Sequence, residues 1–349
     1  MRRVALIVFA ALEQMMSAIS SAGWAVVGGV ITALVAATLV RPALTVCGAP
    51  AGRWPRMMSV IGLVLGAALA YSMSEFQCQA TPVVLPDPFS QDLRILFHAV
   101  CLGLLLVITA TDLVTLYIPD FVVHLGIVIG ITAATASGQL QIEHVWVDWN
   151  EVIKDLRGPY IPEWLKHSQH WHGLAWSSAG ALVGAVLTAV IRKVAEFALG
   201  RPAMGAGDVT LMAMVGAFLG WQATVIAFFL APVLALALGP LARRISAEKA
   251  VPYGPFLALG AIVVMFAWRW IWMFEIEIGT AGPLGVDDRM TTFAVRRLFG
   301  DWVLLLGLSV VSIGGTAGLM GLMRLFWTLP IERERVTSEP VSPDSPPVG

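Results

Sequence analysis

Two aspartates are the residues of this sequence best placed to do chemistry. Asp112 and Asp208 each lie where a nearly uncharged apolar stretch meets a polar loop. A charged side chain at the centre of a membrane helix costs on the order of 2.5–3.5 kcal/mol by insertion scales. Two carboxylates at matching places in an apolar chain therefore indicate one shared site. Carboxyl groups that share a single proton can activate water and polarise a peptide carbonyl, which is the chemistry of an aspartyl protease.

The residues around each aspartate suit such a site. Gly205 and Gly207 precede Asp208 and lack a Cβ atom, so the backbone there can approach a substrate closely. Asp208 is expected to begin a helix, where its charge suits the N-terminal dipole. Pro119 favours a helix start shortly after Asp112, and Asp120 could cap that helix or line the site.

The elements that position these residues are predicted to be membrane helices. The chain has 349 residues, of which 58% are hydrophobic and 13% charged, whereas a soluble domain is about 25% charged. A spanning helix needs about 20 mostly apolar residues. The sequence thus predicts an all-α fold, a polytopic helical membrane protein with about ten apolar segments. These segments are 4–19, 24–40, 57–73, 94–111, 118–136, 173–191, 208–220, 222–240, 255–273 and 302–323.

The distribution of Lys and Arg predicts the orientation of these segments. Most basic residues fall in short loops. If the N-terminus is cytoplasmic, these loops lie on the cytoplasmic side, as expected for loops rich in Lys and Arg. Three long loops, 74–93, 137–172 and 274–301, then lie outside. In this topology Asp112 and Asp208 both fall at the cytoplasmic face. The first segment is predicted to be a membrane helix rather than a cleaved signal, and Gly220-Trp221 is predicted to turn the chain back.

Three motifs resemble those of the type IV prepilin leader peptidases. Asp112 with Ile118-Pro119-Asp120 resembles the first aspartate motif of that family, and Gly205-Ala-Gly-Asp208-Val209 resembles the second, GxGD. The string from Val251 to Gly260 is similar to the segment that follows the catalytic helices. The resemblance covers about residues 95–265.

This resemblance implies a membrane aspartyl endopeptidase of the bacterial inner membrane. Its partners would be the lipid bilayer and a prepilin or pseudopilin-like substrate, whose short basic leader is cut on the cytoplasmic side. Asp112 and Asp208 would be the catalytic pair, while Gly205, Gly207, Pro119 and Asp120 would shape the substrate-binding loops. Type IV pilus assembly and type II secretion are the processes that use such enzymes.

The chain also departs from the family pattern. Many members carry a basic residue two places after the second aspartate, where this chain has Thr210. Larger members have two CxxC pairs associated with N-methylation, whereas Cys47, Cys78 and Cys101 lie far apart and form no such pair. We therefore predict no methyltransferase activity.

The sequence predicts four regions. Residues 1–93 form N-terminal membrane segments of unassigned role, and residues 94–273 form the peptidase core with an extracytoplasmic insertion at 137–172. Residues 274–327 hold an extracytoplasmic loop and the last membrane helix, and the tail 328–349 is predicted to be disordered because it is rich in Pro, Ser and Glu.

Other interpretations of the same residues remain. Paired carboxylates also occur in transporters and channels, and the chain could be a catalytically silent relative of the peptidases. The histidines of His167-x-x-His170-x-His172 could bind a metal, but the tryptophans around them favour a segment at the membrane surface, and this loop lies on the side opposite the aspartates, so we predict no metal. We also predict no cofactor, and no nucleic-acid partner because the net charge is −1. Tryptophans such as Trp176, Trp268 and Trp272 are predicted to be anchors at the membrane interface.

Overall fold

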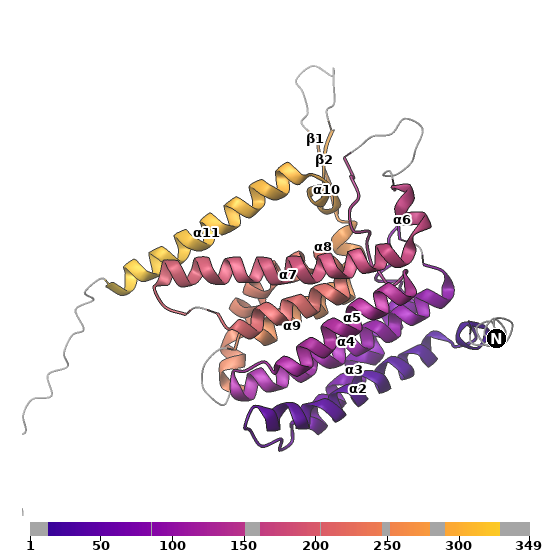
Figure 1. Ribbon diagram of the computed structural model, residues 1–349, viewed down its shortest axis with the longest axis horizontal. Helices are drawn as coiled ribbons and strands as arrows, with labels where there is room; N and C mark the ends of the chain where they lie inside the picture. The colour runs from indigo at the N-terminus through magenta and orange to yellow at the C-terminus, as the bar shows by residue number, and fades with distance from the viewer. Residues whose placement is uncertain are drawn as a thin grey trace, which may run out of the picture.

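The protein is a nearly all-helical bundle (Figure 1). A computed structural model describes residues 13–84, 86–150, 161–202, 204–245, 252–279 and 290–328. The helices are α2 (Ser21–Val46), α3 (Trp54–Ser74), α4 (Pro88–Thr115), α5 (Asp120–Ser137), α6 (Glu163–His167), α7 (Gln169–Leu199), α8 (Ala206–Ile245), α9 (Gly254–Trp272), α10 (Val295–Gly300) and α11 (Trp302–Thr328). The strands β1 (Glu275–Gly279) and β2 (Met290–Ala294) form one antiparallel pair.

Within the described ranges, 8 helices are long and apolar enough to cross a membrane. This confirms a polytopic helical membrane protein. The predicted segment 4–19 lies mostly outside the described residues, as does almost all of the predicted disordered tail 328–349. The two-stranded pair was not expected, because its residues fall inside the segment 274–301 that the sequence predicts only as a loop.

The segments 208–220 and 222–240 are both part of α8, which is broken at Gly220. Gly220 has φ 75° and ψ 171°, a backbone conformation that suits glycine. Beyond this break the chain doubles back, because Met212 and Thr224 both lie against Gly184 of α7. Twelve residues of straight helix would separate them by about 18 Å. The predicted turn at Gly220 is therefore present.

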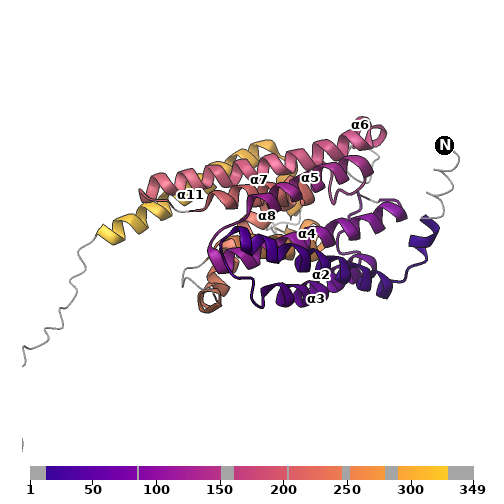
Figure 2. The ribbon, with the colours of Figure 1, turned by 60° about the horizontal axis from the view of Figure 1, so that its bottom comes forward.

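Helix α4 lies at the centre of the bundle, packed by α2, α3, α5, α8 and α9. In its most apolar stretch 78% of the residues are buried, compared with none in that of α11. Figure 2 shows α11 on the side of α7, away from α2 and α3. Helix α4 begins sharply, because Asp87 caps it by accepting the N–H of Ser90 at 2.9 Å. The buried course of α4 leads to Asp112 near its other end.

The end of the bundle opposite Asp112 is held by a buried loop segment. Arg94 of α4 donates to the carbonyl of Gln141 at 2.7 Å, and Gln222 of α8 donates to that of His144 at 2.7 Å. Arg94 precedes Asp112 by about 27 Å along α4. Trp268 donates to the carbonyl of Ile142 at 3.1 Å.

The predicted role of three tryptophans as interfacial anchors is wrong. Trp176 and Trp268 are 0% exposed and Trp272 is 1% exposed. Trp268 and Trp272 stack on each other with ring centroids 4.9 Å apart. Packing of the rings buries these side chains, and the N–H of Trp268 also donates to the carbonyl of Ile142. Packing of that kind is not visible in composition. These side chains belong to the core.

Candidate active site

Asp112 lies in the last turn of α4 and is held by the start of α9. The residue is 6% exposed, and its Oδ2 accepts the backbone N–H of Gly254 at 3.0 Å. Leu116, with φ 54°, ends the helix in the left-handed region and donates its N–H to the carbonyl of Asp112 at 3.0 Å. The helix end therefore fixes the backbone of Asp112 while α9 fixes its side chain.

Asp208 lies in the first turn of α8 and is 5% exposed. Its Oδ2 accepts the backbone N–H of Gly205 at 3.1 Å. Asp208 is three residues after Gly205, so this bond is the backward half of a capping box. The carboxylate also suits the positive end of the helix dipole. The GxGD motif therefore forms a capped helix start that holds the aspartate in place.

Ile118 packs against Gly207, which precedes Asp208, and against Gly254, which holds Asp112. A Cβ on Gly207 would lie 2.8 Å from Cβ of Ile118, and a Cβ on Gly254 would lie 2.6 Å from Oδ2 of Asp112 and 3.2 Å from Cδ1 of Ile118. The loop after α4 and the starts of α8 and α9 thus meet without room for extra atoms. The carboxyl groups of Asp112 and Asp208 interact electrostatically across this junction, and two negative charges there would repel each other.

Two further side chains interact electrostatically with Asp208. Tyr253, next to Gly254, is half-buried, and burial together with the charge of Asp208 raises the pKa of its phenol, which stays protonated at neutral pH. The guanidinium group of Arg192 on α7 also interacts electrostatically with Asp208. Sequence reasoning missed both roles. Only the string Val251–Gly260 carried a signal for Tyr253, and the separation in sequence hid Arg192.

The other predicted loop residues lie beside this site. Pro119 caps the start of α5 with no side-chain hydrogen bond, and Asp120 opens that helix. Asp120 is exposed and accepts the hydroxyl of Tyr117 at 3.4 Å. Gly205 binds Asp208 as described, and Thr210 Oγ1 donates to the carbonyl of Gly207 at 3.0 Å. Thr210 therefore supports the helix start and leaves the carboxylates free.

The three histidines of the candidate metal motif have separate partners. The Nδ1 atom of His167 lies 3.3 Å from Glu163, and that of His170 lies 2.9 Å from the carbonyl of Thr135. His172 is buried and accepts the N–H of Val145 at 3.2 Å. In the part of the chain that the structure describes, no group of three His, Cys, Asp or Glu residues is arranged to hold a metal ion.

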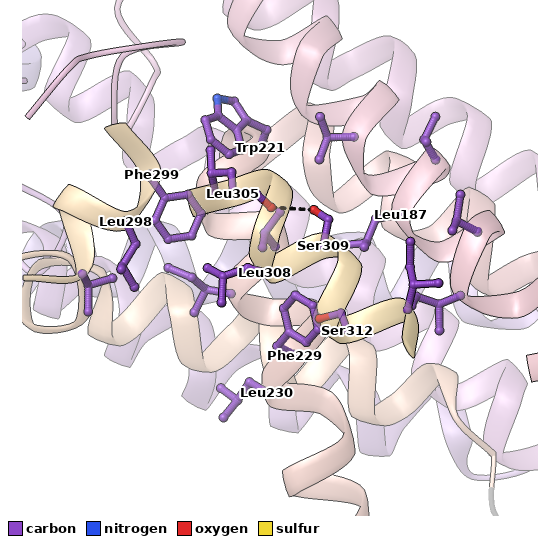
Figure 3. Close-up of a pocket in the computed structure, with 18 of the residues that line it drawn as sticks. Leu187, Trp221, Phe229, Leu230, Leu298, Phe299, Leu305, Leu308, Ser309 and Ser312 are labelled. Carbon is purple, nitrogen blue, oxygen red and sulfur yellow. Dashed lines mark hydrogen bonds between the residues drawn. The ribbon is translucent and has the colours of Figure 1, made fainter. Parts of the chain in front are cut away.

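A large apolar groove lies apart from the aspartates (Figure 3). Its volume is about 940 Å³, and its walls come from α7, α8, α10 and α11. Leu187, Phe229 and Leu308 are among the residues that line it, and Ser309 directs its hydroxyl to the carbonyl of Leu305 at 2.8 Å. Such a surface between membrane helices suits apolar chains rather than hydrolysis.

Comparison with known proteins places this architecture in a family. Residues 99–240, which include both aspartates, match the type IV leader peptidase family. Proteins named prepilin leader peptidase/N-methyltransferase are similar. That of Burkholderia pseudomallei is 31% identical over 126 residues, covering 32% of this chain and 41% of the relative. That of Aeromonas hydrophila is 29% identical over 156 residues, covering 40% and 54%, and that of Pseudomonas putida is 33% identical over 118 residues, covering 33% and 39%.

Fold and site together define a polytopic helical membrane protein with a buried carboxylate pair. Residues 99–240 match the type IV leader peptidase family, and this part of the chain is a distant homologue of the prepilin leader peptidase/N-methyltransferases. The resemblance seen in the sequence motifs is thus confirmed. The match spans about half or less of the length of these relatives. No solved structure matches the chain significantly.

Proposed function

We propose that this protein is a membrane aspartyl endopeptidase that removes the leader of prepilin or pseudopilin-like proteins at the cytoplasmic face of the bacterial inner membrane. Asp112 and Asp208 are the catalytic pair. The observation that carries the proposal is the meeting of these two carboxyl groups, far apart in the sequence, around Ile118 and Gly254. The family match over residues 99–240 supports the same activity.

The geometry suggests how the pair works. Each aspartate uses Oδ2 to accept one backbone N–H. Among the described residues, neither Oδ1 accepts a hydrogen bond, so one oxygen of each group is available to water or substrate. The ionised carboxylate takes a proton from water, which attacks the peptide carbon, while the protonated partner donates to the carbonyl oxygen. The roles then exchange as the amine leaves.

Low dielectric surroundings strengthen this division of roles. Asp112 is 6% exposed and Asp208 is 5% exposed, and two interacting negative charges in such a buried site are costly. The pair therefore carries one proton in its active form, and its ionisation belongs to both residues together. An asparagine at either position cannot give or take the shared proton, so the two side chains can no longer exchange the roles of acid and base.

Leader cleavage tests the proposal. The protein is co-expressed with a prepilin-like substrate, and the size of the substrate is followed by gel and mass spectrometry. We expect cleavage by the wild type and a loss of at least about 1,000-fold in Asp112→Asn and in Asp208→Asn, since a catalytic carboxylate acts in the rate-determining chemistry. Asp148→Asn, at the opposite end of the bundle, serves as the matched control.

The cleavage experiment has three distinguishable outcomes. Loss of cleavage in both site variants, with normal accumulation in the membrane and full activity of the Asp148→Asn control, supports the proposal. Normal cleavage by both site variants would show that the dyad assignment is wrong. Absence of cleavage by the wild type across a panel of prepilin and pseudopilin substrates contradicts the proposed activity itself.

A further inference from the structure

The proposed cleavage gives no role to the apolar groove between α7, α8 and α11. Its volume of about 940 Å³ is near the upper end for ligand sites in proteins, on the order of 300–1,000 Å³. Among the described residues that line it, none is charged. Apolar walls without polar partners do not hold ordered water. In a membrane, this groove is therefore filled by apolar groups.

The few polar side chains of the groove are mostly engaged within the chain. The indole N–H of Trp221 donates to the carbonyl of Val145 at 2.6 Å, and the hydroxyl of Ser309 donates to that of Leu305 at 2.8 Å. Of the described lining residues, only Ser312 adds a further hydroxyl (Figure 3). A ligand in this groove is thus recognised by its apolar surface.

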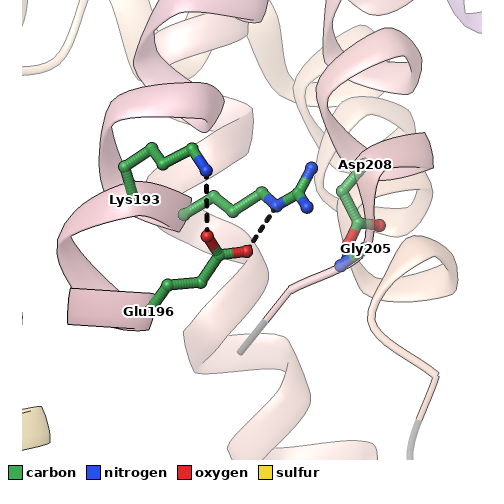
Figure 4. A network of polar contacts seen from close by, with 5 residues as sticks. Lys193, Glu196, Gly205 and Asp208 are labelled. Carbon is green, nitrogen blue, oxygen red and sulfur yellow. Dashed lines mark hydrogen bonds and ion pairs between the residues drawn. The ribbon is translucent and has the colours of Figure 1, made fainter. Parts of the chain in front are cut away.

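The wall that α7 contributes ends where charged residues begin. Ile191 is the last residue of α7 that lines the groove. The next two residues, Arg192 and Lys193, pair with Glu196 at 2.8 and 3.2 Å (Figure 4). The side chain of Lys193 is 77% exposed, and long basic side chains near helix ends reach toward the membrane interface. The groove therefore lies on the hydrocarbon side of this boundary.

The length of the groove distinguishes a lipid chain from a membrane helix. Its α7 wall runs from Leu182 to Ile191 and its α8 wall from Trp221 to Val233, which is about 13 Å and about 18 Å of helix. A spanning helix crosses a hydrocarbon core of about 30 Å, whereas one acyl chain occupies about half of that thickness. The walls match the length of the acyl chain.

The side chains of the walls favour the same occupant. Helices α7 and α8 touch through Gly180 and Gly216, and small residues are typical of contacts between membrane helices. Among the described residues that line the groove, none is glycine or alanine, and most are valine, leucine, isoleucine or phenylalanine. Bulky walls of this kind keep a second helix backbone at a distance but fit a flexible hydrocarbon chain.

We propose that this groove is a binding site for a phospholipid, one acyl chain of which lies between α7, α8 and α11. The bilayer surrounds the groove with such chains. A chain in the groove contacts all three helices at once and completes the packing of α11, none of whose most apolar stretch is buried within the protein. This site is separate from the aspartates, so its test needs no cleavage and stands whether or not the proposed function holds.

Phospholipid that stays with the purified protein tests the proposal. The wild type is purified in a mild detergent, and its retained lipid is identified and counted by mass spectrometry. We expect a bound phospholipid in the wild type and its loss in Ser309→Phe and in Ser312→Phe, because the added ring occupies the groove. Gly314→Phe is the matched control. Gly314 is two residues from Ser312, on the other side of α11, and nothing lies within 4 Å of an added Cβ there.

A photoreactive phospholipid locates the bound chain. The probe carries a diazirine in its acyl chain, and the protein is irradiated after unbound lipid has been washed away. We expect labelling of the groove walls, such as residues 182–191 of α7 and 225–233 of α8, in the wild type and in Gly314→Phe. Circular dichroism and gel filtration show whether each variant is folded, so that loss of label can be assigned to the filled groove.

The results decide between a phospholipid and other occupants. Retained phospholipid and groove labelling in the wild type and Gly314→Phe, both lost in the folded serine variants, support the proposal. A wild type without retained phospholipid, or equal retention in Ser312→Phe, overturns it. So does a retained free fatty acid in place of phospholipid. Displacement of the label by the apolar helix of a prepilin-like substrate would assign the groove to a peptide instead.

Discussion

At the scale of single residues, the site depends on the absence of atoms as much as on their presence. Gly254 donates its N–H to Asp112. Because Gly254 has no side chain, the carboxylate of Asp112 has room to lie against the backbone. An added Cβ would approach Oδ2 of Asp112 to 2.6 Å, shorter than non-bonded carbon and oxygen atoms tolerate. Glycine is therefore required at this position for the geometry of the aspartate.

Gly254→Ala tests this requirement. The new methyl group displaces the carboxylate of Asp112, and a misplacement of about 1 Å can cost on the order of 100-fold in rate. We expect a loss of cleavage of that size, measured by the substrate-processing assay. Gly307→Ala in α11, where nothing lies within 4 Å of the added Cβ, is expected to cleave normally. Full activity of Gly254→Ala would contradict the described contact.

Much of this site follows from sequence, though not its contacts. The two aspartates were identifiable because carboxylates are rare beside apolar segments, and the glycines before Asp208 because they form the GxGD motif with it. The donor to Asp112 is a backbone N–H from α9, and such groups have no side-chain signature. Arg192 carries no signal of its own in the sequence, because its electrostatic interaction with Asp208 depends on how α7 packs on α8.

At the scale of elements, α7 and α8 pack at very short distance. A Cβ on Gly180 would lie 2.0 Å from the carbonyl oxygen of Gly216, and the reverse holds for a Cβ on Gly216. Small residues at such contacts let membrane helices approach closely. This contact fixes how far α7 is shifted along the first half of α8. The position of Arg192 relative to Asp208 follows from that shift.

Gly180→Ala is expected to separate the two helices. Overpacking of this kind costs about 1–3 kcal/mol, so the free energy of unfolding in detergent should fall by that amount, as measured by denaturant titration. Gly314→Ala, placed in α11 where nothing lies within 4 Å, should unfold like the wild type. Equal stability of the two variants would show that the helices do not touch at Gly180.

The helices themselves were largely predictable, because long apolar runs have few other structures in a membrane. The break at Gly220 was also predictable, from a glycine between two apolar runs. The pairing of β1 with β2 and the short helices α6 and α10 were not, since short elements in polar segments depend on contacts that composition does not reveal. The predicted region boundaries and the orientation in the membrane stay predictions.

At the scale of the whole molecule, the two ends of the bundle carry different kinds of polar group. The end away from the aspartates contains Glu143, which is 1% exposed and accepts the N–H of His144 at 3.1 Å. Its Oε2 is buried and has no hydrogen-bond partner within the described ranges. Burial raises the pKa of Glu143 to about 8, so the folded protein holds this carboxyl group protonated at neutral pH.

Stability should therefore depend on pH through Glu143. Its folded-state pKa lies above the ordinary value of 4.5, so the folded state binds the proton more tightly than the unfolded state. The corresponding stability is fully present below about pH 4.5 and is lost as the pH rises through about 8. We expect Glu143→Gln to unfold at higher temperature than the wild type at pH 8, with a smaller difference at pH 5.

Thermal unfolding in detergent at both pH values measures this effect. Glu163→Gln, at an exposed side chain, should follow the wild type at each pH. A Glu143→Gln variant whose stability changes with pH as the wild type does would mean that Glu143 is ionised in the folded protein.

The proposed activity requires Asp112 and Asp208 to face each other across the ends of α4 and α8. Cross-linking tests this most directly. Cysteines are placed as Asp112→Cys and Asp208→Cys in a chain whose three native cysteines are replaced by alanine, and treated in native membranes with a short bifunctional thiol reagent. We predict efficient cross-linking of this pair, identified by mass spectrometry, and none between Asp112→Cys and Asp148→Cys. If both cysteines react singly but never link, the two carboxyl groups do not share a site.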